Sequence, residues 1–204
     1  MSIFIKICGI KTDEAIDCCI ETDVNAIGFV FEPTSKRYVT PAQAAVLGKR
    51  IPSQIKKIAV ARTLTVAKWR ELVEVFPLDG IQLDADELDK LMIPKHIEVL
   101  PVYRESQAPL AWPRRCLWEG LESGVGRAVN WEVAAQLARQ TELVLAGGLS
   151  ADNVAQAIAK VNPYGVDVSS GVEDALGQKS VDKISQFVRA ARGAAAAVSI
   201  AQMH

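Results

Sequence analysis

The sequence has little net charge of either sign and few aromatic residues. Lys and Arg number 23 against 24 Asp and Glu, which leaves a formal net charge of -1. This balance excludes an overall basic field that would hold nucleic acid or an anionic membrane, although a small anion can still bind at a local site. Only 6% of residues are aromatic, while 50% are hydrophobic and 23% are charged. Such a composition argues against a disordered chain or a disulfide scaffold.

Metal-binding side chains are scarce and poorly spaced. The two histidines lie far in the sequence from the cysteines, and no two cysteines have the CxxC spacing, so we expect no metal site. The start of the chain lacks the apolar core of a signal peptide, which favours a cytoplasmic location and free thiols. The cysteines are Cys8, Cys18, Cys19 and Cys116.

Long apolar runs and nucleotide motifs are also missing. No run approaches the roughly 18 residues of a membrane-spanning helix, and neither GxxxxGK[ST] nor a complete GxGxxG is present. The 204 residues suffice for one domain with a sizeable core. We assign residues 1–193 to this domain. Residues 194–204 are expected to be a C-terminal tail, either a frayed helix end or a remnant of an expression vector.

Strand and helix patterns alternate along the chain. Eight short apolar or β-branched segments predict strands at residues 3–7, 25–30, 58–60, 80–83, 97–102, 116–118, 143–146 and 165–168. Seven segments of helical periodicity lie between or after them, at 13–21, 41–50, 66–75, 86–92, 131–139, 153–160 and 181–192. Eight alternating units in 204 residues favour a closed (β/α)8 barrel over its alternative, a doubly wound open sheet.

Polar residues gather at the carboxyl ends of the predicted strands. In a barrel these ends converge on one mouth, whereas an open sheet would spread them along an edge. The residues are Cys8, Glu32, Arg37, Asp84, Glu119, Gly147, Gly148 and Asp167.

Two glycine-containing loops follow the seventh and eighth strands. Gly147 and Gly148 follow the segment LVLA, and Ser169, Ser170 and Gly171 follow VDV. Either loop alone is best explained as a tight turn, but the pair predicts a phosphate cradle built from backbone N–H groups. A helix that starts after strand eight would direct its positive end at the same anion.

Four motifs resemble those of the phosphoribosylanthranilate isomerase family. They are KICGI at 6–10, DVNAIGFVFEPTSKRYV at 23–39, LAGGLSADNV at 145–154 and YGVDVSSGVE at 164–173. The resemblance implies a (β/α)8 barrel without a cofactor. It also implies a small phosphorylated substrate, with no nucleic-acid or membrane partner, and leaves monomer or homodimer open. The implied reaction is the Amadori rearrangement of N-(5'-phosphoribosyl)anthranilate to 1-(2-carboxyphenylamino)-1-deoxyribulose 5-phosphate in tryptophan biosynthesis.

The resemblance assigns roles to four side chains. The cysteine of KICG, Cys8, is the general base, which requires that its pKa be lowered or that partial ionisation suffice. Glu119 takes the place of the family's strand-six aspartate as general acid, with Glu122 as the competing candidate. Arg37 is expected to grip the anthranilate carboxylate and Asp167 to hold the amino or sugar side. Lys6 is not expected to assist Cys8, because Cys8 is predicted to lie beyond the end of the strand.

The sequence departs from the family at two further strand ends. Ala61-Arg62-Thr63 replaces the usual FVN, and Gln82-Leu83-Asp84-Ala85 replaces QLHG. We expect Arg62 and Asp84 to pair with each other. Two alternative functions stay open: a related barrel isomerase acting on another phosphorylated aminosugar, and a phosphate-binding barrel without catalytic activity.

Overall fold

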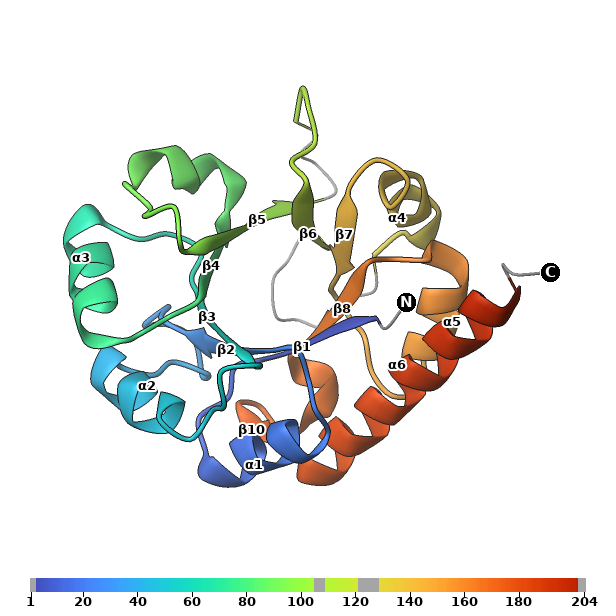
Figure 1. Cartoon of the computed structure of the whole chain (residues 1–204), viewed down its shortest axis with the longest axis horizontal. Helices are drawn as coiled ribbons and strands as arrows, with labels where there is room; N and C mark the ends of the chain where they lie inside the picture. The colour runs from blue at the N-terminus through green and yellow to red at the C-terminus, as the bar shows by residue number, and fades with distance from the viewer. Residues whose placement is uncertain (1–2, 105–108, 121–128, 202–204) are drawn as a thin grey trace.

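Eight parallel strands close into a barrel in chain order, with β8 paired to β1. The computed structural model describes residues 3–104, 109–120 and 129–201, and Figure 1 shows the ring of strands with the helices outside it. The closed ring confirms the (β/α)8 prediction and excludes the open sheet. The strands are β1 Phe4–Cys8, β2 Ala26–Val30, β3 Lys56–Val60, β4 Gly80–Asp84, β5 Glu98–Arg104, β6 Arg115–Glu119, β7 Glu142–Leu145 and β8 Gly165–Val168.

Within the residues that the structure describes, six α-helices form most of the outer layer. Threonine side chains at 12, 40 and 65 cap the first three helices, each accepting a hydrogen bond from the backbone N–H three residues later. At Thr40 the cap is a full capping box with Pro41 at the first helical position, as the sequence indicates. The helices are α1 Asp13–Glu21, α2 Pro41–Gly48, α3 Val66–Val75, α4 Trp131–Leu137, α5 Val154–Val161 and α6 Val181–Ala201.

The structure differs from the expected elements at three places. The segment predicted as a helix at 86–92 is the 3-10 helix η1 (Ala85–Lys90), which buries no residue and so lacks an apolar face to support α-helix. After β8 come the short 3-10 helix η2 (Ser170–Val172) and an unpredicted hairpin of β9 (Glu173–Ala175) and β10 (Gln178–Lys179). Among the described residues, no helix lies between β5 and β6.

The last helix runs beyond its predicted end at residue 192. Helix α6 continues to Ala201 and lies alongside α5 in Figure 1. Ala194, Ala195 and Val198 pack against the core, so residues that look like a small-residue tail in the sequence cover apolar surface in the fold.

Side chains alternate along each strand between the barrel interior and the helical layer. Outward residues such as Ile5 and Ile7 join the large core beneath the helices. Leu100, Val102, Leu117, Val144 and Ala146 form a separate apolar cluster with Phe4. Because these residues share the inward register, the same alternation directs the last residues of several strands into the barrel mouth.

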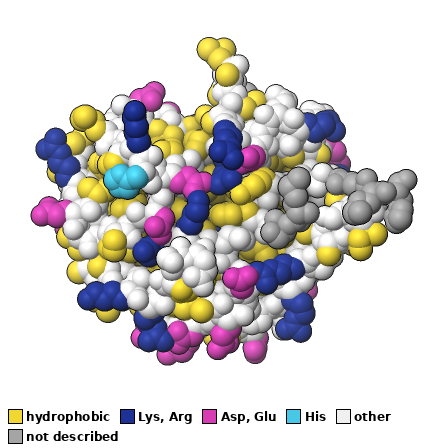
Figure 2. Space-filling view, in the orientation of Figure 1, with side chains coloured by type: hydrophobic (Ala, Val, Ile, Leu, Met, Phe, Trp, Pro, Cys, Tyr) yellow, Lys and Arg dark blue, Asp and Glu magenta, His cyan; other side chains and the backbone are white. Residues whose placement is uncertain are grey.

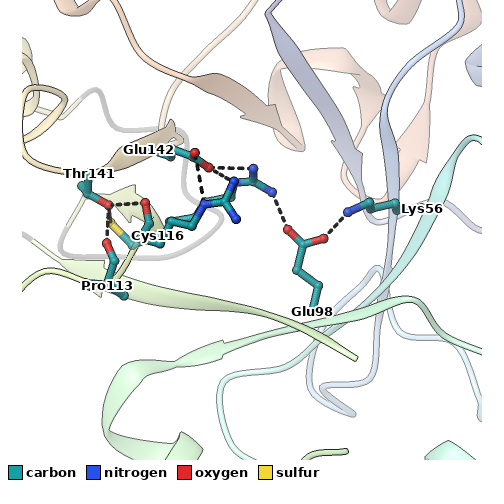
Figure 3. Close-up of polar contacts among 8 residues, drawn as sticks. Lys56, Glu98, Pro113, Cys116, Thr141 and Glu142 are labelled. Carbon is teal, nitrogen blue, oxygen red and sulfur yellow. Dashed lines mark hydrogen bonds and ion pairs between the residues drawn. The ribbon is translucent and has the colours of Figure 1, made fainter. Parts of the chain in front are cut away.

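Ion pairs cover the amino-terminal ends of the strands, opposite that mouth. Glu98 at the start of β5 contacts both Lys56 and Arg115, and Arg115 donates to Glu142 over 2.7 Å (Figure 3). The Arg115 guanidinium also lies 4.1 Å from the centre of the Tyr164 ring. These contacts tie together the starts of four strands, β3, β5, β6 and β7.

The outer surface carries charges of both signs. Figure 2 shows acidic and basic side chains interspersed over the face that it displays. Within the described part of the chain, none of the helices combines the length and the apolar character needed to cross a bilayer.

We predict that Arg115→Leu lowers the free energy of unfolding by about 2 kcal/mol, because two carboxylates lose their shared donor and Tyr164 loses its cation contact. Urea unfolding measures the change. Arg114→Leu is the matched control, since Arg114 is 85% exposed and its contact with Glu142 is 3.3 Å long; it should cause little measurable loss. Equal losses in the two variants would show that the Arg115 ion-pair network is not what stabilises this end.

Candidate active site

The carboxyl ends of the strands enclose a polar cavity of about 350 Å³. Its floor comes from the last inward residues of the strands, and its rim from the loop between β2 and α2. Five of the predicted site residues line it: Cys8, Arg37, Glu119, Asp167 and Ser169. The remaining four, Gly147, Gly148, Ser170 and Gly171, lie outside this lining.

A larger crevice of about 820 Å³ lies near the amino-terminal ends of the strands, where Tyr164 and Val198 are among its lining residues. Volume alone does not identify the functional site. Burying a charged group costs free energy unless it is paired and hydrogen-bonded, so a concentration of buried charges is the more informative feature. The charged side chains that the described residues bury belong to the smaller cavity or contact its lining: Lys6, Arg37, Asp84, Arg104, Asp167, Glu173 and Lys179. We therefore place the candidate site at the carboxyl-terminal mouth.

Cys8 is the last residue of β1 and points into the mouth beside Lys6. The two side chains share the inward face because they are two residues apart in one strand. A β-carbon on Gly28 would lie 3.1 Å from Cys8 Sγ and 3.2 Å from Lys6 Nζ, so both atoms converge over that glycine. The expectation that Cys8 lies beyond the strand, out of reach of Lys6, is wrong.

Lys6 is fully buried and donates to Asp167 Oδ1 over 2.7 Å. These residues are register partners on β1 and β8, so the backbone pairing itself brings them together. Burial disfavours the ammonium, yet Asp167 and Cys8 together outweigh this effect and raise the pKa of Lys6. Asp167 thus balances a buried charge and also lines the cavity.

Burial raises the pKa of the Cys8 thiol. The charge and hydrogen bonding of Lys6 oppose this effect, Asp167 adds to it, and Lys179 opposes it. The protein therefore favours the neutral thiol, so of the two conditions named for Cys8 as the base, a lowered pKa or partial ionisation, the second is the one that applies. All four cysteines are free, as predicted.

Glu119 ends β6 and shares the guanidinium of Arg104 with Asp84. Arg104 Nη2 donates to Glu119 Oε1 and to Asp84 Oδ1, both over 2.8 Å. Arg62 Nε lies 3.7 Å from Asp84 Oδ2, which confirms the predicted pairing of these two residues. The competing carboxylate, Glu122, lies outside the described residues.

Arg37 is held by a carboxylate of the protein itself. Its Nε and Nη2 donate to the two oxygens of Glu173 over 2.7 and 2.9 Å. Lys179 and the Gly177 N–H donate to the same carboxylate. Burial tends to raise the pKa of Glu173, but these donors lower it to about 2. Lys179 also donates to Ser169, so the hairpin fixes both the arginine and the loop after β8.

The glycine loops after β7 and β8 lie in direct contact. A β-carbon on Gly171 would come within 1.9 Å of the Leu149 carbonyl oxygen, so only glycine allows this approach. Gly147 and Gly148 have φ values of +88° and +65°, which other residues rarely adopt. Asn153 holds the first loop by donating to the Gly148 carbonyl and accepting from the Ser150 N–H. The expected longer helix after β8 is absent from the described residues, and the three-residue η2 stands in its place.

Sequence reasoning missed Arg104, Glu173 and Lys179. Arg104 could have been found from strand alternation, because it shares the inward register of Leu100 and Val102 and ends β5. Glu173 and Lys179 carry no such signal, because they depend on the unpredicted hairpin. The described residues include no cluster of three His, Cys, Asp or Glu side chains arranged to hold a metal ion.

Comparison with known proteins gives a consistent match over most of the chain. Residues 5–190 match the family described as N-(5'phosphoribosyl)anthranilate (PRA) isomerase. An N-(5'-phosphoribosyl)anthranilate isomerase from Pelobacter propionicus is 38% identical over 205 residues, covering 93% of this chain and 96% of its own.

Two solved structures share the fold over most of both chains. One shows generated monomers of the dimeric phosphoribosylanthranilate isomerase of Thermotoga maritima, with 28% identity, a TM-score of 0.78, and coverage of 94% and 99%. The other is a phosphoribosyl anthranilate isomerase in complex with reduced 1-(o-carboxyphenylamino)-1-deoxyribulose 5-phosphate, with 27% identity, a TM-score of 0.75, and the same coverage.

We predict that Glu173→Gln lowers the free energy of unfolding by roughly 3 kcal/mol at neutral pH, because two buried cations lose their counter-charge. The folded pKa is about 2 against an ordinary 4.5. The contribution of Glu173 is therefore complete above pH 4.5 and disappears as the pH falls toward 2. Unfolding measured from pH 7 to pH 2.5 should show the variant converging on the wild type.

Asp174→Asn is the control for this series. Asp174 is the next residue in the chain, and its side chain is 65% exposed in a pair with Lys183. A much smaller loss is expected. A Glu173→Gln loss that does not change with pH would contradict the assignment of the buried ion pair.

Proposed function

The chain belongs to the N-(5'-phosphoribosyl)anthranilate isomerase family, and we propose that Cys8 and Glu119 are the base and the acid of its reaction. The protein is an isomerase of tryptophan biosynthesis. It converts N-(5'-phosphoribosyl)anthranilate to 1-(2-carboxyphenylamino)-1-deoxyribulose 5-phosphate. The proposal for the two residues is carried by one observation: a thiol and a carboxyl group from opposite sides of the barrel line the same cavity.

The reaction needs a general acid that protonates the furanose ring oxygen and a general base that removes a proton from C2'. In the proposed sequence, protonated Glu119 donates to the furanose ring oxygen, the bond from that oxygen to C1' breaks, and the sugar opens to a Schiff base. The Cys8 thiolate then removes the proton at C2', and the electron pair moves toward nitrogen to give an enolamine. Tautomerisation yields the ketone, so no external oxidant or reductant enters.

Glu119 must carry a proton to act as an acid. Arg104 is divided between Glu119 and Asp84 through one nitrogen, so neither carboxylate has the guanidinium to itself. A substrate that brings a carboxylate and a phosphate adds negative charge to the mouth, and this added charge favours protonation of a neighbouring carboxylate. We therefore keep Glu119 as the acid despite its contact with Arg104.

Arg37 and Asp167 are proposed to bind the two ends of the anthranilate and sugar portion. The Nε and one Nη2 hydrogen of Arg37 point to Glu173, which leaves the Nη1 edge of the guanidinium for a substrate carboxylate. Asp167 Oδ1 accepts from Lys6, and its second oxygen is the one proposed to accept from a substrate hydroxyl or amine.

The phosphate is proposed to bind at the loops after β7 and β8. Gly147, Gly148, Ser169, Ser170 and Gly171 bring two backbone segments together at adjacent strand ends. The contact between Gly171 and Leu149 supports a single cradle rather than two independent turns. Ser169 has a structural role as well, because its hydroxyl donates to the Cys8 carbonyl.

Three further proposals concern the cellular location, the domain bounds and the oligomeric state. Free cysteines support a cytoplasmic location. We propose one catalytic barrel domain for residues 1–193, with residues 194–201 continuing helix α6. A dimeric isomerase is among the similar solved structures, and we propose that this chain acts as a monomer or a homodimer.

We predict that Cys8→Ser lowers turnover of N-(5'-phosphoribosyl)anthranilate by roughly 10² to 10⁴, because a hydroxyl ionises far too weakly near pH 7 to serve as the base. Steady-state kinetics on the purified protein measure the effect. Cys116→Ser is the control, since Cys116 is buried on the outer side of β6, and it should turn over normally. Normal turnover by Cys8→Ser would remove Cys8 from the mechanism.

We predict that Glu119→Gln lowers turnover sharply while KM changes little, because the amide keeps the shape of the side chain but cannot donate the proton. Glu122→Gln should be mild. Both variants are measured together, and a larger defect in Glu122→Gln would transfer the role of acid to that residue.

A further inference from the structure

Lys6 is a buried cation that the proposed catalytic roles do not use. Its side chain has no solvent exposure and is not part of the cavity lining, so a substrate in the mouth does not touch it. Removing an ammonium group from water costs several kcal/mol unless other charges compensate. Such a residue is poorly explained as packing, because a Leu or Met of similar size would fill the same space without this cost.

The ammonium group of Lys6 lies between a carboxylate and a thiol. On one side is Asp167 Oδ1 at 2.7 Å, and on the other is the thiol of Cys8, which converges with Lys6 Nζ over Gly28. A thiolate at Cys8 would be almost completely buried, since Cys8 is only 6% exposed. A neighbouring cation is the main means by which a protein stabilises a buried thiolate.

We propose that Lys6 is a positioning residue that stabilises the Cys8 thiolate through its ammonium charge, and that Asp167 sets how much of that charge reaches the sulfur. The proposal rests on Cys8 being the base of the isomerisation. Lys6 acts through Cys8 and makes no contact with substrate. The net charge of the pair Lys6 and Asp167 is zero, which is consistent with a Cys8 thiol that is mostly protonated before substrate binds. The ammonium of Lys6 is nevertheless close enough to stabilise the thiolate once it forms.

The other charged groups around Cys8 do not replace Lys6. Lys179 from β10 also favours the thiolate, but it donates to Glu173 and Ser169. Arg37 packs on Gly9, the residue after Cys8, and its guanidinium is directed to Glu173. The facing strand β2 contributes Gly28, which has no side chain. Lys6 and Asp167 are thus the two charges whose removal should act most directly on the sulfur.

The test is the pH dependence of alkylation of Cys8 by iodoacetamide, quantified on the Cys8 peptide by mass spectrometry. In Lys6→Met the pH of half-maximal rate should rise by about one to two units, because the thiolate loses its neighbouring cation. In Asp167→Asn it should fall, because the ammonium is no longer neutralised. Lys6→Arg keeps the positive charge and should return the profile toward that of the wild type.

Folding is monitored in the same digest. Cys19 and Cys116 have no solvent exposure and should stay unmodified in every correctly folded variant. If Lys6→Met exposes these two cysteines, the variant is misfolded, and the proposal is then tested by the alkylation profile of Asp167→Asn alone. A fall in its half-maximal pH supports the proposal, and an unchanged or raised value overturns it. In a folded Lys6→Met protein, an unchanged profile or a shift in the same direction as Asp167→Asn also overturns it.

Turnover separates this proposal from the assignment of Cys8. In Lys6→Met, kcat at pH 7 should fall at least tenfold and recover as the pH is raised, whereas a purely structural defect would not recover with pH. Cys8→Ser could turn over normally while Lys6→Met raises and Asp167→Asn lowers the pH of half-maximal alkylation. In that case Cys8 is not the base, but the electrostatic coupling of Lys6 and Asp167 to its sulfur still holds.

Discussion

The ion pair between Lys6 and Asp167 joins the first and last strands of the barrel. Because the two residues are register partners, the pair forms only when β8 closes onto β1. Closure of the sheet thus brings a cation directly beneath Cys8 and a carboxylate into the wall of the cavity. The carboxyl group of Glu119 reaches the same cavity from β6. The chemistry of the site depends on the barrel being closed, not only on each strand being present.

Two further sets of buried charges give the mouth its shape. Arg104 connects the ends of β4, β5 and β6 by contacting Asp84 and Glu119. Glu173 connects the loop after β2 with the hairpin after β8 by binding Arg37 and Lys179. Arg104 with its two carboxylates sums to -1 and Glu173 with its two cations sums to +1, so the two sets balance each other. Groups that are costly to bury thereby become acceptable where a polar substrate enters. The same arrangement leaves parts of Arg37 and Asp167 directed at the cavity.

The sequence predicted those features that depend on local pattern. Helices α1 and α3 and strand β8 have the expected bounds, because apolar spacing and threonine caps mark their limits. The family motifs pointed to Cys8 and Glu119. A boundary placed one residue too early caused an error. The predicted first strand ended at Ile7, so Cys8 was placed outside it and its position on the same face as Lys6 was not predicted. The partner of Arg37 could not be predicted, because Glu173 lies far along the chain and on a hairpin that the sequence does not indicate.

The most direct test of the account is growth without tryptophan. A bacterial strain that lacks its phosphoribosylanthranilate isomerase is given the gene for this chain or an empty vector, and both are plated on minimal medium with and without tryptophan. The account predicts growth without tryptophan only for the strain that carries the gene. Failure to grow while the folded protein accumulates in the cells would contradict it.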